Sequence, residues 1–212
     1  MDTNQSLNSQ MRAFYSDGFK LGMKVFDSGF NKESLFSAIN EMHEIINELT
    51  DSISVFAKRQ GINIDCKKGC YWCCHQPVFA LDYELDYLKS FIKKNFTSEQ
   101  EKDLIEKAKL KNTHLSKLRN EELLNSKFPC PLLENGACSA YEARPVACRI
   151  YLSTNLTSCQ IFYNKPENEN NFPALLDFPM KAGRMINEGF KAALKSNGIN
   201  TEEFRIEEKL LD

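Results

Sequence analysis

Cysteine is the residue type in this chain best suited to chemistry. Eight cysteines occur in 212 residues, and all of them lie between positions 66 and 159. Thiolates are the ligands that structural Zn²⁺ and iron–sulfur clusters require, so clustered thiols predict a metal centre. They form two groups along the chain, which are Cys66, Cys70, Cys73 and Cys74, and then Cys130, Cys138, Cys148 and Cys159.

The first group has the spacing C-x3-C-x2-C-C. At about 100° per residue, a helical backbone would hold these four side chains within an arc of about 100°, on one face. Gly69 could instead break the helix and let backbone N–H groups turn toward the sulfurs. Lys67 and Lys68 would offset the charge of a thiolate site, or they are ordinary solvated surface. For His75 we expect a supporting role at most, because eight thiols are available.

The second group surrounds Asn135-Gly136, a dipeptide typical of a two-residue hairpin turn. Such a turn would bring Cys130 and Cys138 together as two ligands on a small knuckle. The sequence therefore predicts that this pair meets through the backbone of one hairpin.

The last two cysteines follow a predicted helix start at Pro145, which suits the first helical position. Cys148 then falls on the first turn, where the helix dipole and free N–H groups favour a thiolate. Arg144 and Arg149 add two fixed positive charges beside it. Cys159 is the least constrained by spacing, and it is either a ligand or a buried thiol.

Ligands explain these thiols better than disulfides do. The N-terminus lacks a cationic region followed by an apolar run, and no stretch approaches the ~18 apolar residues of a membrane span, so we expect a cytosolic protein. Thiols stay reduced there. A disulfide between Cys73 and Cys74 would also strain the peptide bond between them. Four disulfides, or cysteines that serve only as small buried hydrophobes, are the alternative interpretations.

Composition limits the class of protein. Hydrophobic residues make up 42% of the chain and charged residues 26%, which excludes wholesale disorder and allows a core of its own. The net charge is −2 and the pI is about 6.0. A nonspecific nucleic-acid or anionic-membrane partner is therefore not expected.

Hydrophobic periodicity predicts helices on both sides of the cysteines. The predicted helices cover residues 10–30, 33–58, 80–95, 97–124, 179–195 and a segment from about 201. A polar loop is expected over 164–171. The fold class is therefore mostly α, with short β-hairpin or irregular segments at a cysteine-rich metal site. His43 and His114 lie on these helices and are expected to be ordinary helix positions.

The predicted organisation has three parts. These are N-terminal helices (1–63), a cysteine-cluster metal-binding domain (64–160) with a helical insert (80–125), and C-terminal helices on the same core (161–212). For both cysteine groups to reach one site, the insert must fold back, most simply as a helical hairpin. The sequence thus predicts that residues far apart along the chain converge.

The combined pattern resembles the YkgJ-type cysteine-cluster family, described as a zinc- or iron-chelating domain. The resemblance covers roughly residues 64–160. Its matching positions are the first four cysteines, Cys130-Pro131-Leu132-Leu133, Gly136, Cys138, Tyr141, Arg144-Pro145, Cys148-Arg149 and an acidic residue at Glu84. It implies metal or iron–sulfur binding by these cysteines. The flagellin lysine methylation associated with longer relatives does not carry over, since periodicity shows no S-adenosylmethionine fold.

Three functional hypotheses follow. The first is a protein that holds an iron–sulfur cluster, of the 4Fe-4S type, through cysteine thiolates, with an unknown downstream role and an unknown protein or redox partner. The second is a structural zinc module without catalysis, since thiolates suit both metals. The third is an iron–sulfur enzyme related to protein modification or S-adenosylmethionine chemistry, because Cys66-x3-Cys70-x-Trp72-Cys73 has the spacing of the latter. No P-loop, dinucleotide fingerprint or Ser/His/Asp set indicates a substrate.

Overall fold

The protein is seen here in a computed structural model, which describes residues 3–27 and 29–212. As predicted, the fold is mostly α. Its α-helices are α1 (Thr3–Lys24), α2 (Lys32–Arg59), α3 (Asp82–Asn95), α4 (Ser98–Leu115), α5 (Asn120–Asn125), α6 (Val146–Arg149), α7 (Leu156–Asn164), α8 (Asp177–Ser196) and α9 (Ile206–Lys209). Short 3-10 turns are η1 (Trp72–His75), η2 (Tyr141–Ala143) and η3 (Glu169–Asn171). None of the described helices has the length and hydropathy to cross a membrane.

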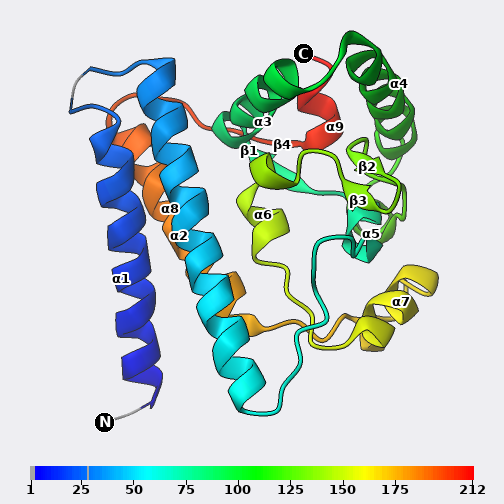
Figure 1. The fold of residues 1–212 in the computed structure, drawn as a ribbon, viewed down its shortest axis with the longest axis horizontal. Helices are drawn as coiled ribbons and strands as arrows, with labels where there is room; N and C mark the ends of the chain where they lie inside the picture. Colours follow the sequence, from blue (N-terminus) through cyan, green and yellow to red (C-terminus); the bar gives the residue numbers. More distant parts are fainter. Residues whose placement is uncertain (1–2, 28) are drawn as a thin grey trace.

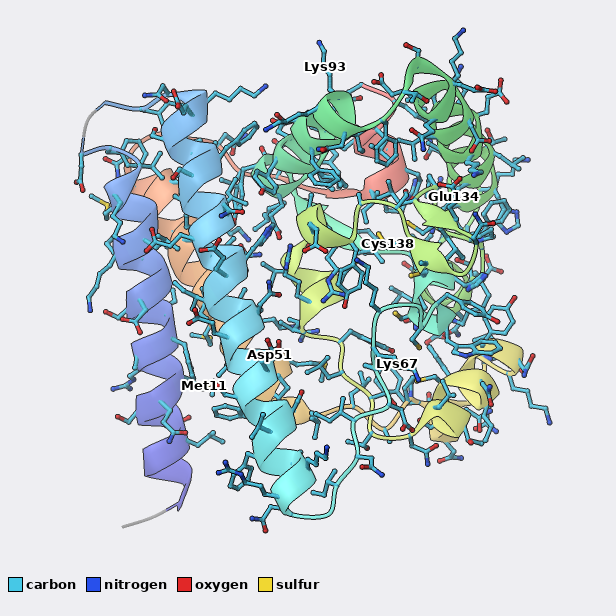
Figure 2. The ribbon with its side chains drawn as sticks, in the orientation of Figure 1. Met11, Asp51, Lys67, Lys93, Glu134 and Cys138 are labelled. Atoms are coloured by element: carbon cyan, nitrogen blue, oxygen red, sulfur yellow. The ribbon has the colours of Figure 1, made fainter. Side chains whose placement is uncertain are left out.

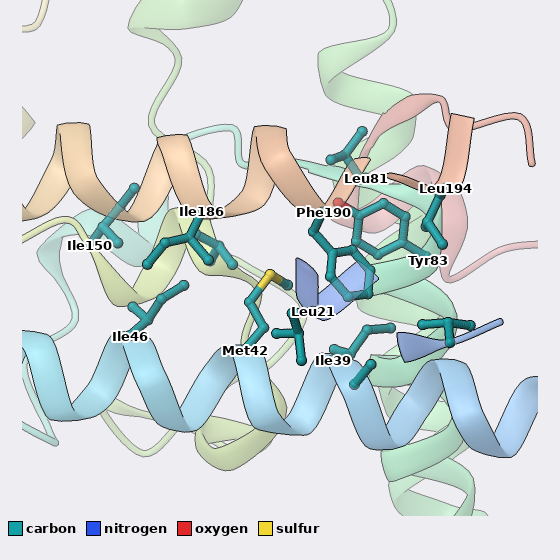
Figure 3. Close-up of a cluster of buried hydrophobic side chains, with 13 residues drawn as sticks. Leu21, Ile39, Met42, Ile46, Leu81, Tyr83, Ile150, Ile186, Phe190 and Leu194 are labelled. Atoms are coloured by element: carbon teal, nitrogen blue, oxygen red, sulfur yellow. The ribbon is translucent and has the colours of Figure 1, made fainter. Parts of the chain in front are cut away.

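Three long helices, α1, α2 and α8, lie side by side on one side of the molecule (Figure 1). Residues Ile39, Met42 and Ile46 of α2 face Ile186 and Phe190 of α8, and all five are buried (Figure 3). Their spacing of three or four residues is the apolar stripe that the sequence predicted.

Glycine lets α1 and α8 approach backbone to backbone. A Cβ atom added to Gly189 would lie 2.0 Å from the carbonyl oxygen of Tyr15, and one added to Gly18 would lie 1.9 Å from that of Ile186. A side chain at either position would therefore push the two helices apart.

The same core includes side chains from all three predicted parts of the chain. Ile39 lies in the N-terminal part, Val146 in the cysteine-rich part and Phe190 in the C-terminal part, and they belong to one buried cluster. The long helices thus support the segment that carries the cysteines. The predicted division at residues 63 and 160 stays a prediction.

The insert between the cysteine groups folds back on itself. The N–H of Cys130 donates to the carbonyl of Cys74 at 2.7 Å, and the N–H of Phe128 donates to the backbone carbonyl of His75 at 2.8 Å. The two ends of the insert therefore meet in the backbone. Between them, α3 and α4 share a second core with α9, formed by residues such as Leu88, Ala108 and Ile206.

The charged helix of the insert is shorter than predicted. Thr97 begins α4 with a capping box to Gln100, as its sequence indicates. The helix ends at Leu115, however, and α5 starts only at Asn120, whose φ of 47° is left-handed. The prediction of one helix to residue 124 was wrong, because Arg119 is extended (φ −137°, ψ 150°) and Asn120 is left-handed, which interrupts the helical backbone.

The C-terminal segment also differs from its predicted helix. Strand β4 (Glu203–Arg205) pairs antiparallel with β1 (Phe79–Leu81), and Phe79 lies opposite Arg205. The N–H of Ile206 continues this pairing to the carbonyl of Val78 at 3.1 Å. Long-range pairing therefore replaces a helix start near residue 201, and only α9 remains helical.

Candidate metal centre

Seven cysteines line one cavity of about 600 Å³, whose wall also includes residues of α6, α8 and the insert. In Figure 2, Lys67 lies on the first cysteine segment and Cys138 on the hairpin above it. The lining cysteines are Cys66, Cys70, Cys73, Cys74, Cys130, Cys138 and Cys148. The two groups of the sequence thus meet in space. Within residues 3–27 and 29–212, no three Cys, His, Asp or Glu side chains converge tightly enough to hold a single ion as they stand.

The first cysteine segment breaks at Gly69. This residue has a φ of +93°, and the N–H of Cys70 donates to the carbonyl of Lys67 at 2.9 Å in a tight turn. Residues Trp72–His75 then form η1. Of the two predicted arrangements, the structure therefore has the interrupted one, since φ > 0 suits glycine alone among these residues.

Helix α7 packs against this segment. The Trp72 and His75 rings contact Tyr163 edge to face, with centroids 5.3 and 4.9 Å away. At the other end of α7, the Asp65 carboxylate accepts a hydrogen bond from the N–H of Leu156 at 2.8 Å. The contacts fix the N-terminal turn of α7 beside Cys66.

Backbone groups around residue 152 hold the Cys66 sulfur. It accepts a hydrogen bond from the N–H of Ser153 at 3.0 Å and lies 3.6 Å from the carbonyl of Tyr151. Burial, and after it the nearby Cys70 and Cys159, raises the pKa of Cys66. Cys159 lies on α7, outside the cavity lining.

The predicted knuckle is present as a hairpin. Strands β2 (Leu133–Glu134) and β3 (Ala137–Cys138) pair antiparallel, so that Leu133 lies opposite Cys138. Asn135 and Gly136 have φ values of 50° and 77°, as a type I′ turn requires. The N–H of Leu133 donates to the carbonyl of Cys130 at 2.9 Å. This turn brings Cys130 and Cys138 to the same cavity.

Glu84 positions Cys148 indirectly. Its carboxylate is buried and accepts hydrogen bonds from Val146 N–H (2.7 Å), Asn187 Nδ2 (3.1 Å) and Leu81 N–H (3.3 Å). The first of these bonds caps the start of α6, which carries Cys148. Burial raises the pKa of Glu84, and the three hydrogen bonds oppose this rise.

Arg149 ties α6 to α2. Its buried guanidinium contacts Asn47 Oδ1 at 2.9 Å and His43 Nδ1 at 3.1 Å, and it also donates to the carbonyls of Arg144 (2.8 Å) and Glu142. Burial, and then Arg149, lowers the pKa of His43 to about 3, so this ring is neutral. His43 is thus more than an ordinary helix position, and its role depends on a partner 106 residues away.

The other site residues predicted from the sequence differ in whether they line the cavity. Arg144 and Tyr141 line the cavity, and the guanidinium stacks 3.8 Å from the ring centroid. Lys67 and Lys68 are both exposed. Lys67 also lines the cavity, and Lys68 Nζ lies 3.6 Å from Glu142 Oε1. The ring of His114 stacks on Phe128, whose N–H donates to the carbonyl of His75. Positive charge therefore borders the thiols mainly through Lys67, Arg144 and Arg149.

Sequence reasoning missed Lys111. Its side chain is 2% exposed, and its ammonium donates to the carbonyl of Gln76 at 3.3 Å and lies 4.0 Å from Glu207 Oε2. Arg205 also belongs to this group. Its Nε forms an ion pair with Glu207 Oε1 at 2.8 Å, but the angle between them is not that of a hydrogen bond. A signal existed, because Lys111 fills a gap in the apolar line of Leu104, Ala108 and Leu115.

Burial makes the thiols weak acids. It is the main cause that raises the pKa of Cys130 to about 12, and it likewise raises the pKa of Cys148 and of Cys138. The pKa of Cys74 rises first through a hydrogen bond with the Cys73 thiol and then through burial, while Lys111 opposes the rise. The buried thiols therefore keep their protons at pH 7, and a bound cation would displace them.

A family model matches residues 65–196, which is more than half of the chain. Its description is "CxxCxxCC: Putative zinc- or iron-chelating domain". The chain belongs to this family. The CxxCxxCC match begins one residue before Cys66 and extends into α8, so it includes all eight cysteines. Comparison with curated proteins and with solved structures gave no match.

The donor set fits the chemistry that the CxxCxxCC description names. Seven thiols line the cavity and an eighth lies on α7, which is the soft donor set for zinc or iron. The chain is therefore a metal-binding protein that acts through its cysteine cluster. Which metal it carries is a separate question.

Proposed function

We propose that the chain is a cytosolic protein that holds an iron–sulfur cluster of the 4Fe-4S type through cysteine thiolates and exchanges electrons with a protein partner. The observation that carries the proposal is the cavity of about 600 Å³ whose wall carries seven thiols from two distant segments. The proposed ligands are drawn from Cys66, Cys70, Cys73, Cys74, Cys130, Cys138, Cys148 and Cys159.

The number of thiols and their surroundings favour a cluster over a single zinc ion. A zinc ion takes four sulfurs about 2.3 Å away, and seven thiols line this cavity. Hydrogen bonds to sulfur and nearby charge tune the potential of such clusters. The Ser153 N–H bond to Cys66 and the charges of Lys111 and Arg144 are groups of this kind.

The protein's own residues would orient the ligands and exclude water. Glu84 fixes α6 and with it Cys148, the hairpin turn holds Cys130 and Cys138 together, and α7 covers the first cysteine segment. A bound cluster would supply one-electron transfer. We do not propose S-adenosylmethionine cleavage, because the strands among residues 3–27 and 29–212 form only two antiparallel pairs.

Anaerobic purification followed by visible absorption and metal analysis tests the proposal. A brown protein with iron and acid-labile sulfide in equal amounts is expected, and Cys148→Ser should lose at least half of both. Ser139→Ala, beside Cys138, is the control and should keep the cluster. A colourless protein with stoichiometric zinc and no sulfide would instead support the structural zinc module.

A further inference from the structure

We propose that the eight cysteines form two adjacent four-thiolate centres, divided at the peptide bond between Cys73 and Cys74. One set, called here the α7 set, comprises Cys66, Cys70, Cys73 and Cys159. The other, called the hairpin set, comprises Cys74, Cys130, Cys138 and Cys148. The inference deepens the proposed function and rests on it, since it assigns the number of centres and the ligands of each.

The α7 set is assembled by the docking of α7 on the first cysteine segment. Tyr163 contacts Trp72 and His75, and the N-terminus of α7 is bound by Asp65. Cys159 lies four residues before Tyr163, so both side chains occupy one helix face. That face is turned toward the segment between Asp65 and His75.

Cys66 lies beside the start of this helix. Its sulfur accepts a hydrogen bond from the N–H of Ser153 at 3.0 Å, and its neighbour Asp65 accepts one from the N–H of Leu156, the first residue of α7, at 2.8 Å. The segment that carries Cys66, Cys70 and Cys73 is therefore bound to α7 at both ends.

The hairpin set is assembled by the insert. Cys74 and Cys130 are joined by the 2.7 Å backbone hydrogen bond, and the hairpin turn brings in Cys138. Cys130, Cys138 and Cys148 all pack against the core of α3, α4 and α9. This set is therefore held by a different part of the fold from the α7 set.

The division falls between neighbours because of the local backbone. Cys73 and Cys74 lie in η1, and a 3-10 helix turns about 120° per residue. Consecutive side chains therefore leave the backbone in different directions. The two residues are consecutive in the chain, so the two centres would be next to each other.

Metal and sulfide counts on wild-type protein provide the first test. Two 4Fe-4S centres correspond to about eight iron and eight sulfide per chain. About four of each would overturn the division. Two zinc ions per chain without sulfide would overturn the iron–sulfur assignment but support two centres. Protein without iron or zinc after reconstitution with both would contradict the proposed function itself.

Paired variants provide the second test. Cys66→Ser with Cys159→Ser removes two ligands of the α7 set, and Cys130→Ser with Cys138→Ser removes two of the hairpin set. Each pair is expected to lose half of the metal, while Thr157→Ala, an exposed control on α7, loses none. Complete loss in both pairs, or no loss in the first, would overturn the proposal. If a pair fails to fold, Cys159→Ser alone must still lose half.

Discussion

Replacing Lys111 by Met should destabilise the protein by about 3 kcal/mol. The substitution keeps the long apolar stem and removes the ammonium from a side chain that is 2% exposed. Glu207, which is 1% exposed, would lose a cation 4.0 Å away, and the Gln76 carbonyl would lose its donor at 3.3 Å.

The magnitude follows from these contacts. Breaking a buried ion pair costs about 3–5 kcal/mol. Arg205 remains 2.8 Å from Glu207, so the charge of that carboxylate stays partly compensated and the lower end applies. A carbonyl left without its donor costs about 1–3 kcal/mol, and the two losses overlap because one ammonium serves both.

Urea unfolding followed by circular dichroism, under anaerobic conditions and at equal metal content, measures this change. Lys107→Met is the matched control, one turn earlier on α4. Its ion pair with Asp103 is exposed, so its free energy of unfolding should change by less than about 0.5 kcal/mol. Equal values for the two variants would refute the assigned role of Lys111. Because Lys111 also lowers the pKa of Cys74 and Cys130, its loss should speed metal removal by a chelator.

Three further outcomes are expected. Acidification below the ordinary His pKa of 6.5 should destabilise the protein through His43, by up to about 1.4 kcal/mol per pH unit. The reason is that the pKa of His43 is about 3 in the folded state, so over this range only the unfolded state binds the proton. The free energy of unfolding of His43→Gln should depend less steeply on acid pH, and an unchanged slope would contradict this. Gly189→Ala should lower the free energy of unfolding by about 1–3 kcal/mol, since its Cβ would meet Tyr15; a neutral or stabilising effect would show that α1 and α8 can separate without cost. Zinc added to metal-free protein at pH 7 should release about four protons per ion, because the thiols bind it as thiolates; an indicator dye that records no release would mean that they are already ionised.

Several of the long helices could be predicted from local sequence pattern. The predicted helix over residues 33–58 is α2 (Lys32–Arg59), and the capping box at Thr97 begins α4 as expected. Apolar spacing and helix caps are local signals, so the helices that they predict do not depend on distant partners. The pairing of β1 with β4 was missed, because it joins two three-residue segments more than 120 residues apart.

The convergence of the two cysteine groups was also predictable, since eight thiols are most simply explained as ligands of a shared site. The residues that surround the cysteines could be predicted only in part. Arg144 and Glu84 could be named from the motif, whereas Lys111 and His43 are defined by partners on other elements. A buried lysine and a surface lysine have the same sequence letter, and only tertiary packing separates them.

The count of acid-labile sulfide per chain tests the central claim most directly, because sulfide belongs to an iron–sulfur cluster and to no zinc site. In protein purified without oxygen, sulfide is expected in a 1:1 ratio to iron. If the thiols of metal-free protein are alkylated before reconstitution, neither iron nor sulfide should be incorporated. Stoichiometric metal without sulfide would contradict the claim that these cysteines hold an iron–sulfur cluster.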